Sequence, residues 1–339
     1  MKQILNASLK HLNSFSVEAR AGSLLELESE EDLQTLIPQH SFDVTSDLIL
    51  GGGSNIVFAG DIEGTVILNR VTGKRIVEDT NEEVVVEANA GENWHQLVLW
   101  CLDHGLSGIE NLSLIPGLVG AAPIQNIGAY GVELADVIES VLTLDLKNGA
   151  AREFRQKDCH FTYRNSRFKS TDAGKYLITG VRLRLQREFK PQLAYKGLGE
   201  ELLSMGVDSP TARQLSDAVI RIRQRKLPDP KTCGNAGSFF KNPVVSRTNA
   251  DLLIKEFSGL PVYPAGDEAK LSAGWLIEQC GWKGRSMGRA AVSEQHALVL
   301  INKGNATGQE ILALADAIQT SVRDRFGIEL EPEPLIIRS

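Results

Sequence analysis

The chain has 339 residues, of which 42% are hydrophobic and 23% are charged, and its formal net charge is −7. A single hydrophobic core seldom supports this length, so two or three domains are expected. The negative charge argues against nucleic acid as the main partner, and no stretch reaches the roughly 18 apolar residues of a membrane span. The first residues lack the pattern of a signal peptide. These features predict a cytoplasmic protein that binds neither nucleic acid nor membrane.

The spacing of the cysteines and of most histidines does not match that of metal ligands, so no metal site is predicted. The four cysteines are far apart and form no C-x-x-C pair, which favours free thiols over disulfides or bound zinc: Cys101, Cys159, Cys233 and Cys280. Five histidines show no metal-ligand spacing and are expected to be structural or to lie on the surface: His11, His40, His95, His104 and His160.

In the first third of the chain, short strands and helices are mixed. Residues 1–20 are expected to be irregular, and a strand-like run then leads into an acidic helix that starts near Ser29. A helix with regular apolar spacing is expected to end at Gly105. Strand-like runs, two of them joined by a glycine turn, are predicted within residues 47–58, 65–70 and 84–91.

The remaining elements include a hairpin at residues 140–154, with Asn148 and Gly149 at its turn. Residues 200–226 have helical spacing, and residues 291–304 are expected to form one strand. Further elements are a strand at 176–186, helices at 250–259, 270–281 and 307–327, and an edge or chain end at 329–339. The order lacks a regular βαβ rhythm, which predicts an α+β protein.

Residues 227–243 have an unusual composition, LPDPKTCGNAGSFFKNP. The stretch is too rich in Pro, Gly, Asn and Asp for a helix or a central strand. Phe239 and Phe240 need burial and would anchor the turn, which leaves the hydroxyl of Ser238 at a fixed place next to Gly237. We interpret the stretch as a site loop, with a purely structural turn as the alternative.

Two further loops are rich in glycine. Residues 50–55 follow a strand and offer converging backbone amides to an anion, and residues 115–131 offer a second set together with Gln125 and Asn126. Neither loop matches the Rossmann or P-loop spacing. One such turn alone is as often structural as functional, but the pair favours a large dinucleotide bound between two lobes.

Five motifs, in order, resemble those of the UDP-N-acetylenolpyruvoylglucosamine reductase family, also called UDP-N-acetylmuramate dehydrogenases: LGGGSNIV, IPGLVGAAPIQNIGAYG, YRNSRFK, KLPDPKTCGNAGSFFKNP and LEPE. The resemblance runs from about Asn13 to Glu333. It implies a flavoenzyme that uses NADPH and noncovalent FAD to reduce an enolpyruvyl ether on a UDP-sugar, a step in making the peptidoglycan precursor UDP-N-acetylmuramate. QLAYKGLGEEL resembles the family type with an additional tyrosine-bearing loop.

The resemblance also implies a domain arrangement. It consists of a two-lobed FAD-binding unit of the vanillyl-alcohol-oxidase kind and a C-terminal α+β substrate-binding domain in a monomer. The expected parts are lobe 1 (residues 1–73 and 326–339), lobe 2 (74–200), a helical connector (201–227) and the substrate domain (228–325). The positions that match the family's FAD-binding loops are Gly51, Gly52, Gly53, Ser54, Asn55, Ile115, Pro116, Gly117, Gly120, Ala121, Gln125, Asn126, Gly128, Ala129 and Tyr130.

Three matched residues would carry the chemistry. Ser238 is the implied proton donor, Arg164 would pair with the carboxylate beside the double bond, and Glu333 would act as a second acid. Without the resemblance, the composition favours a turn hydroxyl for Ser238 and a surface cation for Arg164, and a solvated acid is the alternative for Glu333. The residues matched to the UDP-sugar site are Tyr163, Tyr195, Lys226, Asn242, Tyr263 and Lys270, whose alternative is ordinary surface packing and solvated charge.

The sequence departs from the family pattern at two places. Glu333 is followed by Pro334 and Leu335 where Val-Arg is frequent, and His296 stands where an amide is frequent. Two rival functions are a flavin oxidase that uses oxygen and a nucleotide-sugar binding module without chemistry. The first would not need the Ser238 loop, and the second would be colourless.

Overall fold

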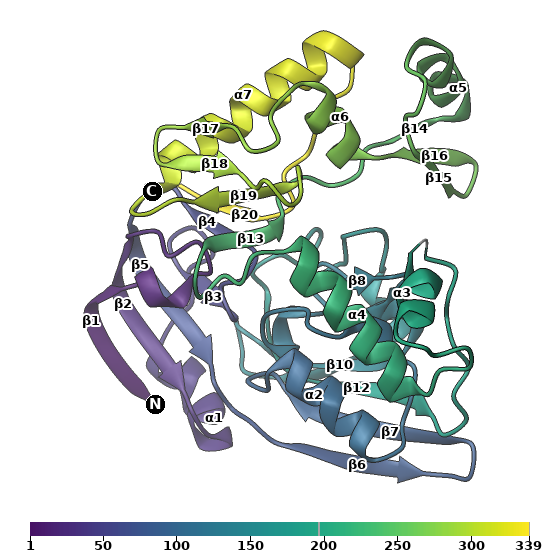
Figure 1. Cartoon of the computed structure of the whole chain (residues 1–339). Helices are drawn as coiled ribbons and strands as arrows, with labels where there is room; N and C mark the ends of the chain where they lie inside the picture. The colour runs from purple at the N-terminus through teal and green to yellow at the C-terminus, as the bar shows by residue number, and fades with distance from the viewer. Residues whose placement is uncertain (196, 339) are drawn as a thin grey trace. The chain divides into compact units, whose positions relative to one another are not determined.

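The computed structural model describes residues 1–195 and 197–338. Its backbone forms two compact units, each assembled from three stretches of chain (Figure 1). Unit 1 contains residues 1–7, 21–52 and 62–223, and unit 2 contains residues 8–20, 53–61 and 224–339. Both units combine helices with sheets, which confirms the α+β class. The structure groups residues 8–20 and 53–61 with the C-terminal part of the chain, whereas the sequence placed them in lobe 1; the finer four-part division stays a prediction.

Unit 1 contains two main sheets. In the first, of order β1-β2-β5-β3, strands β2 and β3 both run parallel to β5, and the second, of order β11-β10-β12-β7-β6, is antiparallel throughout. A small hairpin, β8–β9, is separate from both. The strands are β1 (Lys2–Ser8), β2 (Arg20–Leu27), β3 (Leu48–Leu50), β5 (Ile62–Asn69), β6 (Lys74–Asp79), β7 (Glu83–Asn89), β8 (Gly128–Ala129), β9 (Val132–Glu133), β10 (Ile138–Asp145), β11 (Ala151–Arg155) and β12 (Tyr176–Gln186).

The two faces of the five-stranded sheet differ, as the period-2 alternation along β12 requires. On one face, Val181 and Leu183 are buried with Trp94 and other residues of helix α2 (Trp94–Asp103) in one hydrophobic cluster. On the other, Arg182 pairs with Glu87 at 2.8 Å, and such ion pairs cover the surface. The sheet is thus packed on one side and polar on the other.

The helices of unit 1 begin with side-chain caps where the sequence provides them. Helix α1 (Glu30–Gln39) starts at Ser29 with a capping box, as expected, and α2 starts at Asn93. The helical spacing at residues 200–226 is confirmed in part. The stretch forms two helices, α3 (Leu198–Ser204) and α4 (Ala212–Lys226), interrupted where Gly206 has a φ of +72°. The 3₁₀ turns are η2 (Glu110–Leu112), η3 (Val119–Ala121), η4 (Leu134–Asp136) and η5 (Gln156–Cys159).

Unit 2 contains three sheets. They have the orders β13-β19-β18-β17, β14-β16-β15 and β20-β4, and only the last pair is parallel. The strands are β4 (Ile56–Phe58), β13 (Gly234–Ser238), β14 (Val244–Ser246), β15 (Val262–Ala265), β16 (Glu268–Leu271), β17 (Ser286–Met287), β18 (Ala290–Val292), β19 (Val299–Asn302) and β20 (Leu335–Ile337); the remaining elements are η1 (Lys10–Leu12), α5 (Arg247–Glu256), α6 (Ala273–Gln279) and α7 (Gly308–Phe326).

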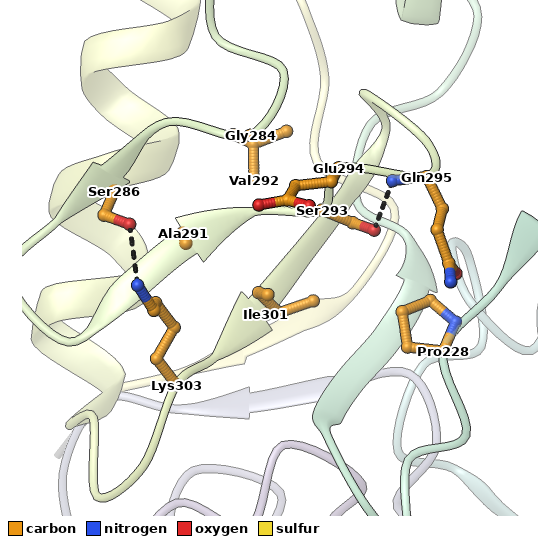
Figure 2. A pocket seen from close by; sticks show the side chains of 10 residues that line it. All are labelled: Pro228, Gly284, Ser286, Ala291, Val292, Ser293, Glu294, Gln295, Ile301 and Lys303. Atoms are coloured by element: carbon orange, nitrogen blue, oxygen red, sulfur yellow. Dashed lines mark hydrogen bonds between the residues drawn. The ribbon is translucent and has the colours of Figure 1, made fainter.

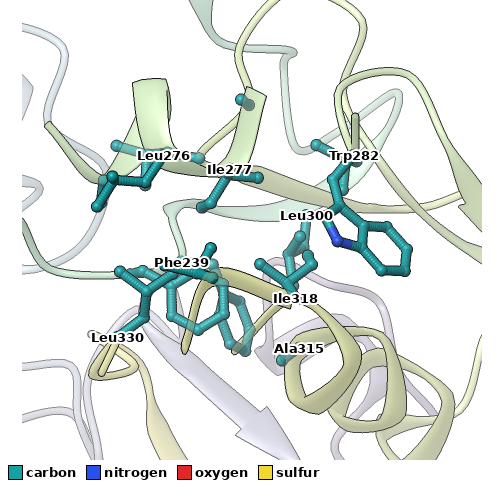
Figure 3. Close-up of a cluster of buried hydrophobic side chains, with 14 of the residues drawn as sticks. Phe239, Leu276, Ile277, Trp282, Leu300, Ala315, Ile318 and Leu330 are labelled. Carbon is teal, nitrogen blue, oxygen red and sulfur yellow. The ribbon is translucent and has the colours of Figure 1, made fainter. Parts of the chain in front are cut away.

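The core of unit 2 lies between α7 and the sheet that contains β18 and β19 (Figure 3). Phe239, Leu300 and Ile318 are completely buried there. Helix α7 has a capping box at Thr307 and ends at Gly327, whose φ of +65° suits glycine. A methyl group at Gly308 would lie 1.8 Å from the carbonyl oxygen of Phe58, so α7 begins in direct backbone contact with β4.

Three expectations about local structure are wrong. Residues 1–20 are not irregular throughout, because β1 occupies Lys2–Ser8. Residues 291–304 form the antiparallel pair β18 and β19 instead of one strand. In the stretch 227–243, Gly234–Ser238 is an edge strand paired with β19, so the loop description holds only for the flanking residues. Among the described residues, no helix combines the length and apolar composition that crossing a bilayer requires.

Candidate functional site

The two glycine segments of unit 1 lie side by side. A Cβ atom at Gly52 would be 2.8 Å from the Cα of Gly117, and one at Gly51 would be 3.0 Å from the Cβ of Ala121. Because these atoms belong to the backbone or to a short side chain, a larger residue would displace a whole segment. The sequence predicted two loops that act together, and the structure brings Gly51–Gly52 and Gly117–Ala121 into contact across more than 60 residues of chain.

The start of helix α2 shapes the second glycine segment. The indole Nε1 of Trp94 donates to the carbonyl of Leu112 at 3.0 Å, and the backbone N–H of Trp94 donates to Gly117 at 3.1 Å. The N–H of Val119 donates to the carbonyl of Glu92 at 2.8 Å. Backbone groups around Ile115, Pro116 and Gly117 are therefore oriented by the buried first turn of a helix.

Beyond this segment, the predicted flavin residues have differing surroundings. The side chain of Asn126 is buried and already bonded: its Nδ2 donates to Glu133 at 2.8 Å and its Oδ1 accepts from the N–H of Ala135 at 2.9 Å. The side-chain amide of Asn126 therefore stabilises its own loop through these hydrogen bonds. Tyr130 and Tyr195 form an edge-to-face pair with ring centroids 4.8 Å apart, so a predicted substrate residue packs on a predicted flavin residue.

Arg164 is held in a strained turn. Its φ is +52°, a region that non-glycine residues seldom occupy and that is frequent at functional sites. Reciprocal backbone hydrogen bonds of 3.1 Å between Thr162 and Asn165 close the turn. The guanidinium lies 5.2 Å from the centre of the Tyr163 ring and donates from Nη2 to the carbonyl of Gly128 at 2.8 Å. Arg164 is therefore fixed beside the loop that contains Gly128, Ala129 and Tyr130.

In unit 2, two of the predicted catalytic residues are brought close together. The N–H of Glu333 donates to the carbonyl of Phe239, the residue after Ser238, at 2.8 Å, and Phe240 pairs with Pro332. The side-chain Nδ2 of Asn55 also donates to the backbone carbonyl of Glu333, at 3.3 Å. Both Ser238 and Glu333 are half-buried. Three residues predicted for chemistry or flavin binding thus meet from distant parts of the chain.

The departure from the family pattern at Pro334 and Leu335, directly after Glu333, has a clear structural consequence. Pro334 is buried, and Leu335 begins β20, with its N–H bonded to the carbonyl of Asn55 at 3.0 Å. The side chain of Leu335 is 51% exposed. The strand therefore forms with leucine at the position where the family frequently has arginine, and the charged group is replaced by an exposed apolar one.

The predicted substrate residues Asn242, Tyr263 and Lys270 lie on one small part of unit 2. Tyr263 on β15 is directly opposite Lys270 on β16, which places their side chains on the same face of the hairpin. The Oδ1 of Asn242 accepts from the N–H of Ala273 at 3.0 Å, at the start of α6. Tyr263 is exposed and Lys270 half-buried, so an aromatic ring and an ammonium are offered together.

Lys226 lies near His296, the second position at which the sequence departs from the family pattern. Burial is the main cause that lowers the pKa of the His296 imidazole, and the charges of Lys226 and Lys283 lower that pKa further. The Nδ1 of His296 accepts from the N–H of Leu298 at 3.2 Å. A neutral ring with one nitrogen already bonded therefore stands close to a lysine predicted to bind substrate.

Arg223 was not predicted as a site residue, yet its surroundings are unusual. Its Nε is buried and has no hydrogen-bond partner among the described residues. Burial, together with the charge of Arg164, lowers the pKa of the guanidinium, while Tyr130 acts in the opposite direction. A signal exists in the sequence: Arg223 is four and seven residues after the buried Val219 and Ser216, so it lies on the buried face of α4. A half-buried cation with a buried, unused donor is suited to an anionic ligand.

A cavity of about 230 Å³ lies elsewhere in unit 2, beside β18 and β19 (Figure 2). Among its lining residues, Lys303 donates to Ser286 at 3.2 Å and the N–H of Gln295 donates to Ser293 at 3.2 Å. As far as residues 1–195 and 197–338 define it, the lining contains none of the predicted site residues. It is also smaller than sites that hold dinucleotides. Within the same residues, no group of three or more His, Cys, Asp or Glu side chains is arranged to hold a metal ion.

Comparison with known proteins shows what this chain is similar to. The profile of the FAD binding domain matches residues 22–155, and that of the UDP-N-acetylenolpyruvoylglucosamine reductase C-terminal domain matches residues 229–337. A UDP-N-acetylenolpyruvoylglucosamine reductase from Burkholderia multivorans is 47% identical over 96% of this chain and 94% of its own length. One from Azoarcus sp. is 49% identical over 98% of this chain and 97% of its own.

A solved structure agrees with the sequence relatives. The crystal structure of UDP-N-acetylenolpyruvylglucosamine reductase (MurB) from Thermus caldophilus is similar over 99% of this chain and 98% of its own, with a TM-score of 0.65 and 26% sequence identity. This similarity confirms the expected fold, an FAD-binding part followed by a C-terminal α+β domain. The chain belongs to the UDP-N-acetylenolpyruvoylglucosamine reductase family.

Proposed function

We propose that this protein reduces the enolpyruvyl group of UDP-N-acetyl-3-O-(1-carboxyvinyl)-glucosamine to the lactyl ether of UDP-N-acetylmuramate, with NADPH as reductant and FAD as cofactor. The reaction consumes one hydride and one proton and serves peptidoglycan precursor synthesis. The observation that carries the proposal is the pairing of the Ser238 strand with the Glu333 segment through the 2.8 Å bond between Glu333 and Phe239. This backbone contact supports a shared role for the Ser238 hydroxyl and the Glu333 carboxyl, because the reaction requires proton delivery and charge stabilisation.

The residues of unit 1 fit a flavin dinucleotide. The close contact of Gly52 with Gly117 leaves two segments in which only small residues are tolerated. Backbone amides of these segments suit a diphosphate, and Arg223 adds a half-buried guanidinium whose buried Nε lacks a partner among the described residues. We propose that Gly51, Gly52, Gly117, Gly120 and Ala121 hold the cofactor.

The same role extends to the other predicted flavin residues. Gly53, Ser54 and Asn55 belong to unit 2, where Asn55 is bonded to Glu333. For Asn126, the bonded side chain leaves the backbone as the contacting group. The proposed set is completed by Ile115, Pro116, Gln125, Gly128, Ala129 and Tyr130.

When bound and reduced by NADPH, the flavin would supply the hydride that the terminal vinyl carbon receives. The side chains of the chain itself then have three tasks. Arg164 offers a planar donor pair to the substrate carboxylate, and protonated Glu333 hydrogen-bonds the developing enolate. Ser238 donates a proton to the adjacent carbon. A serine hydroxyl is a weak acid, so its position in a half-buried strand next to Glu333 is essential to the proposal.

The nucleotide-sugar is held by cations and aromatic rings. Lys226 and Lys270 provide charges for the diphosphate, and Tyr263, directly opposite Lys270, provides a ring beside it. Tyr163, Tyr195 and Asn242 complete the set. We also propose that NADPH reduces the flavin and leaves before the sugar binds, that the enzyme is monomeric, and that it acts in the cytoplasm.

The decisive experiment separates the two half-reactions under anaerobic conditions. The purified protein is expected to be yellow and to release FAD when denatured. NADPH should bleach the flavin, and the enolpyruvyl UDP-sugar should restore its colour while UDP-N-acetylmuramate appears. Light scattering coupled to size exclusion will report the oligomeric state.

Two alternative outcomes would overturn the proposal. Rapid reoxidation by air with no response to the UDP-sugar would identify an oxidase instead. A colourless protein that still binds the UDP-sugar would identify a binding module without chemistry.

A further inference from the structure

The glycine segment at Ile115–Gly117 is preceded by two residues that are held from two helices. The hydroxyls of Ser113 and of Ser216 on α4 are 2.7 Å apart and both residues are buried. The backbone N–H of Leu114 donates to the Nδ1 of His95 on α2 at 3.0 Å. The conformation of the segment is therefore set immediately before Ile115, by one contact from each helix.

Leu114 requires such support. Its φ is +58°, in the left-handed region that a leucine adopts only when the surrounding structure imposes it. The half-buried side chain of His95 supplies the acceptor that satisfies the Leu114 N–H in this conformation. Within residues 1–195 and 197–338, His95 is the titratable side chain that accepts from this N–H.

The contact depends on the protonation state of the ring. Nδ1 accepts a hydrogen bond only when it carries no proton, so the neutral ring must have its proton on Nε2. Burial is the main cause that lowers the pKa of His95, and Arg223 and Arg213, both on α4, lower it further. These arginines are the charged groups that act on the ring from the packed helix, and both favour the neutral form.

We propose that His95 is a positioning residue for the cofactor, whose neutral ring holds Leu114 so that Ile115–Gly117 keeps the shape that binds FAD, and whose protonation releases the segment. The inference rests on the proposed function, because it assigns Ile115–Gly117 to FAD. It gives this histidine a role in cofactor retention, where the sequence predicted only a structural or surface residue.

The direction of the pH effect follows from proton linkage. In the released segment the ring would recover a pKa near the ordinary histidine value of 6.5, whereas in the held segment its pKa is lower. Release therefore takes up a proton, and the held state loses stability as the pH falls through 6.5 and below. FAD should be retained firmly at pH 8 and lost faster at pH 5.

The test measures FAD release by the rise of flavin fluorescence after dilution, between pH 8 and pH 5. Wild type should release FAD about tenfold faster at the acid end, the equivalent of one lost hydrogen bond. His95→Asn keeps an acceptor, Oδ1, in place of Nδ1 but does not titrate, so its release rate should stay low and flat. His95→Leu lacks the acceptor and should release FAD fast at every pH.

A matched control is available on the same helix. His104 lies at the C-terminal end of α2, where its Nδ1 contacts the carbonyl of Trp100, and His104→Asn should follow the wild-type profile. Circular dichroism will verify that each variant is folded at both pH values. A wild-type profile retained in His95→Asn, or slow release from His95→Leu, would overturn the proposal.

A second readout does not require the cofactor. Hydrogen–deuterium exchange of the Leu114 amide should accelerate on acidification in wild type, relative to the intrinsic rate, but not in His95→Asn. If the purified protein contains no flavin at any pH, the proposed function fails, and the exchange rates still decide whether His95 holds Leu114. Equal protection of Leu114 in wild type and His95→Leu would refute that contact.

Discussion

The flavin-side and substrate-side candidates are built in different ways. In unit 1, the segments at Gly51–Gly52 and Gly117–Ala121, which we propose bind through backbone groups, are packed closely enough that one added methyl collides with a neighbouring Cα or Cβ. In unit 2, Tyr263 and Lys270, which we propose bind through side chains, lie on a short hairpin and are partly open to solvent. One region fixes its shape by excluding side chains, and the other presents them.

This difference predicts how each region tolerates change. A rigid backbone site should lose its ligand and its stability together when a glycine is replaced, because the same contacts provide both. A side-chain site should lose function while the fold is kept, because partly exposed residues contribute little to packing. Substitutions in the two regions therefore distinguish them.

The largest effect is expected from Ser238→Ala. The change removes the proposed proton donor and little else, so NADPH should still bleach the flavin while reduction of the UDP-sugar falls about 10²- to 10⁴-fold. Anaerobic stopped-flow measurements of the two half-reactions will show this. Ser286, on β17 of the same sheet, is the control, and Ser286→Ala should leave both rates unchanged. A substrate half-reaction near the wild-type rate would exclude Ser238 as the donor.

Gly52→Ala should reduce both the stability of unit 1 and its flavin content. The added Cβ would lie 2.8 Å from the backbone of Gly117, so one segment must move, which should cost about 1–3 kcal/mol of stability. Flavin content and melting temperature should fall together. Gly199 in α3 is the control, since a Cβ there meets no atom of the described residues within 4 Å and alanine favours a helix. Full flavin content in Gly52→Ala would contradict the proposal that flavin binding depends on the close backbone packing of unit 1.

Lys270→Ala should weaken substrate binding while leaving the fold intact. Loss of one partly exposed charge for the diphosphate should raise the KM for the UDP-sugar about tenfold with little change in kcat, and the effect should shrink in high salt. Steady-state kinetics at two ionic strengths will measure it. Lys303→Ala, at the separate cavity, should not change KM. A drop in melting temperature as large as that of Gly52→Ala would argue against a tolerant side-chain site.

The smallest effect concerns a buried acid in unit 1. Burial is the main cause that raises the pKa of Glu110, although the N–H of Gly108 donates to its Oε2 at 2.7 Å. A raised pKa means that the folded state loses stability as the pH rises from about 4.5 through that pKa. Glu110→Gln stays neutral and keeps an acceptor, so its melting temperature relative to wild type should increase from pH 4.5 to pH 7. The exposed Glu294→Gln should show no such trend, and parallel curves for Glu110→Gln would contradict the reasoning.

Elements with strong local signals were predicted correctly from the sequence. Helix α2, the hairpin β10–β11 and helix α7 carry their periodicity and their turn or capping residues within a few positions of each other. Local signals failed where a partner strand decides the structure. The edge strand β13 consists of GNAGS, a turn-like composition, and forms a strand because β19 is beside it. The turn between β18 and β19 contains no Gly or Pro, so it was missed.

The candidate site shows the same limit. The motif residues Ser238, Glu333 and Arg164 were identified from their motifs, but no local pattern predicts that the N–H of Glu333 bonds to Phe239. A local sequence pattern also does not predict that the Nε of Arg223 is buried. The helical spacing from Ser216 and Val219 does predict that Arg223 lies on the buried face of α4. Contacts between distant segments depend on the folded chain as a whole.

The parallel pairing of β20 with β4 has a consequence for synthesis. The strand Ile56–Phe58 leaves the ribosome long before its partner Leu335–Ile337 is made. At typical elongation rates the interval is on the order of tens of seconds. During that time the unpaired edge of β4 and the apolar residues of unit 2 remain exposed on the nascent chain. Pairing of β4 with β20, and with it any binding by Asn55 and Glu333, must therefore wait until Leu335–Ile337 has been made.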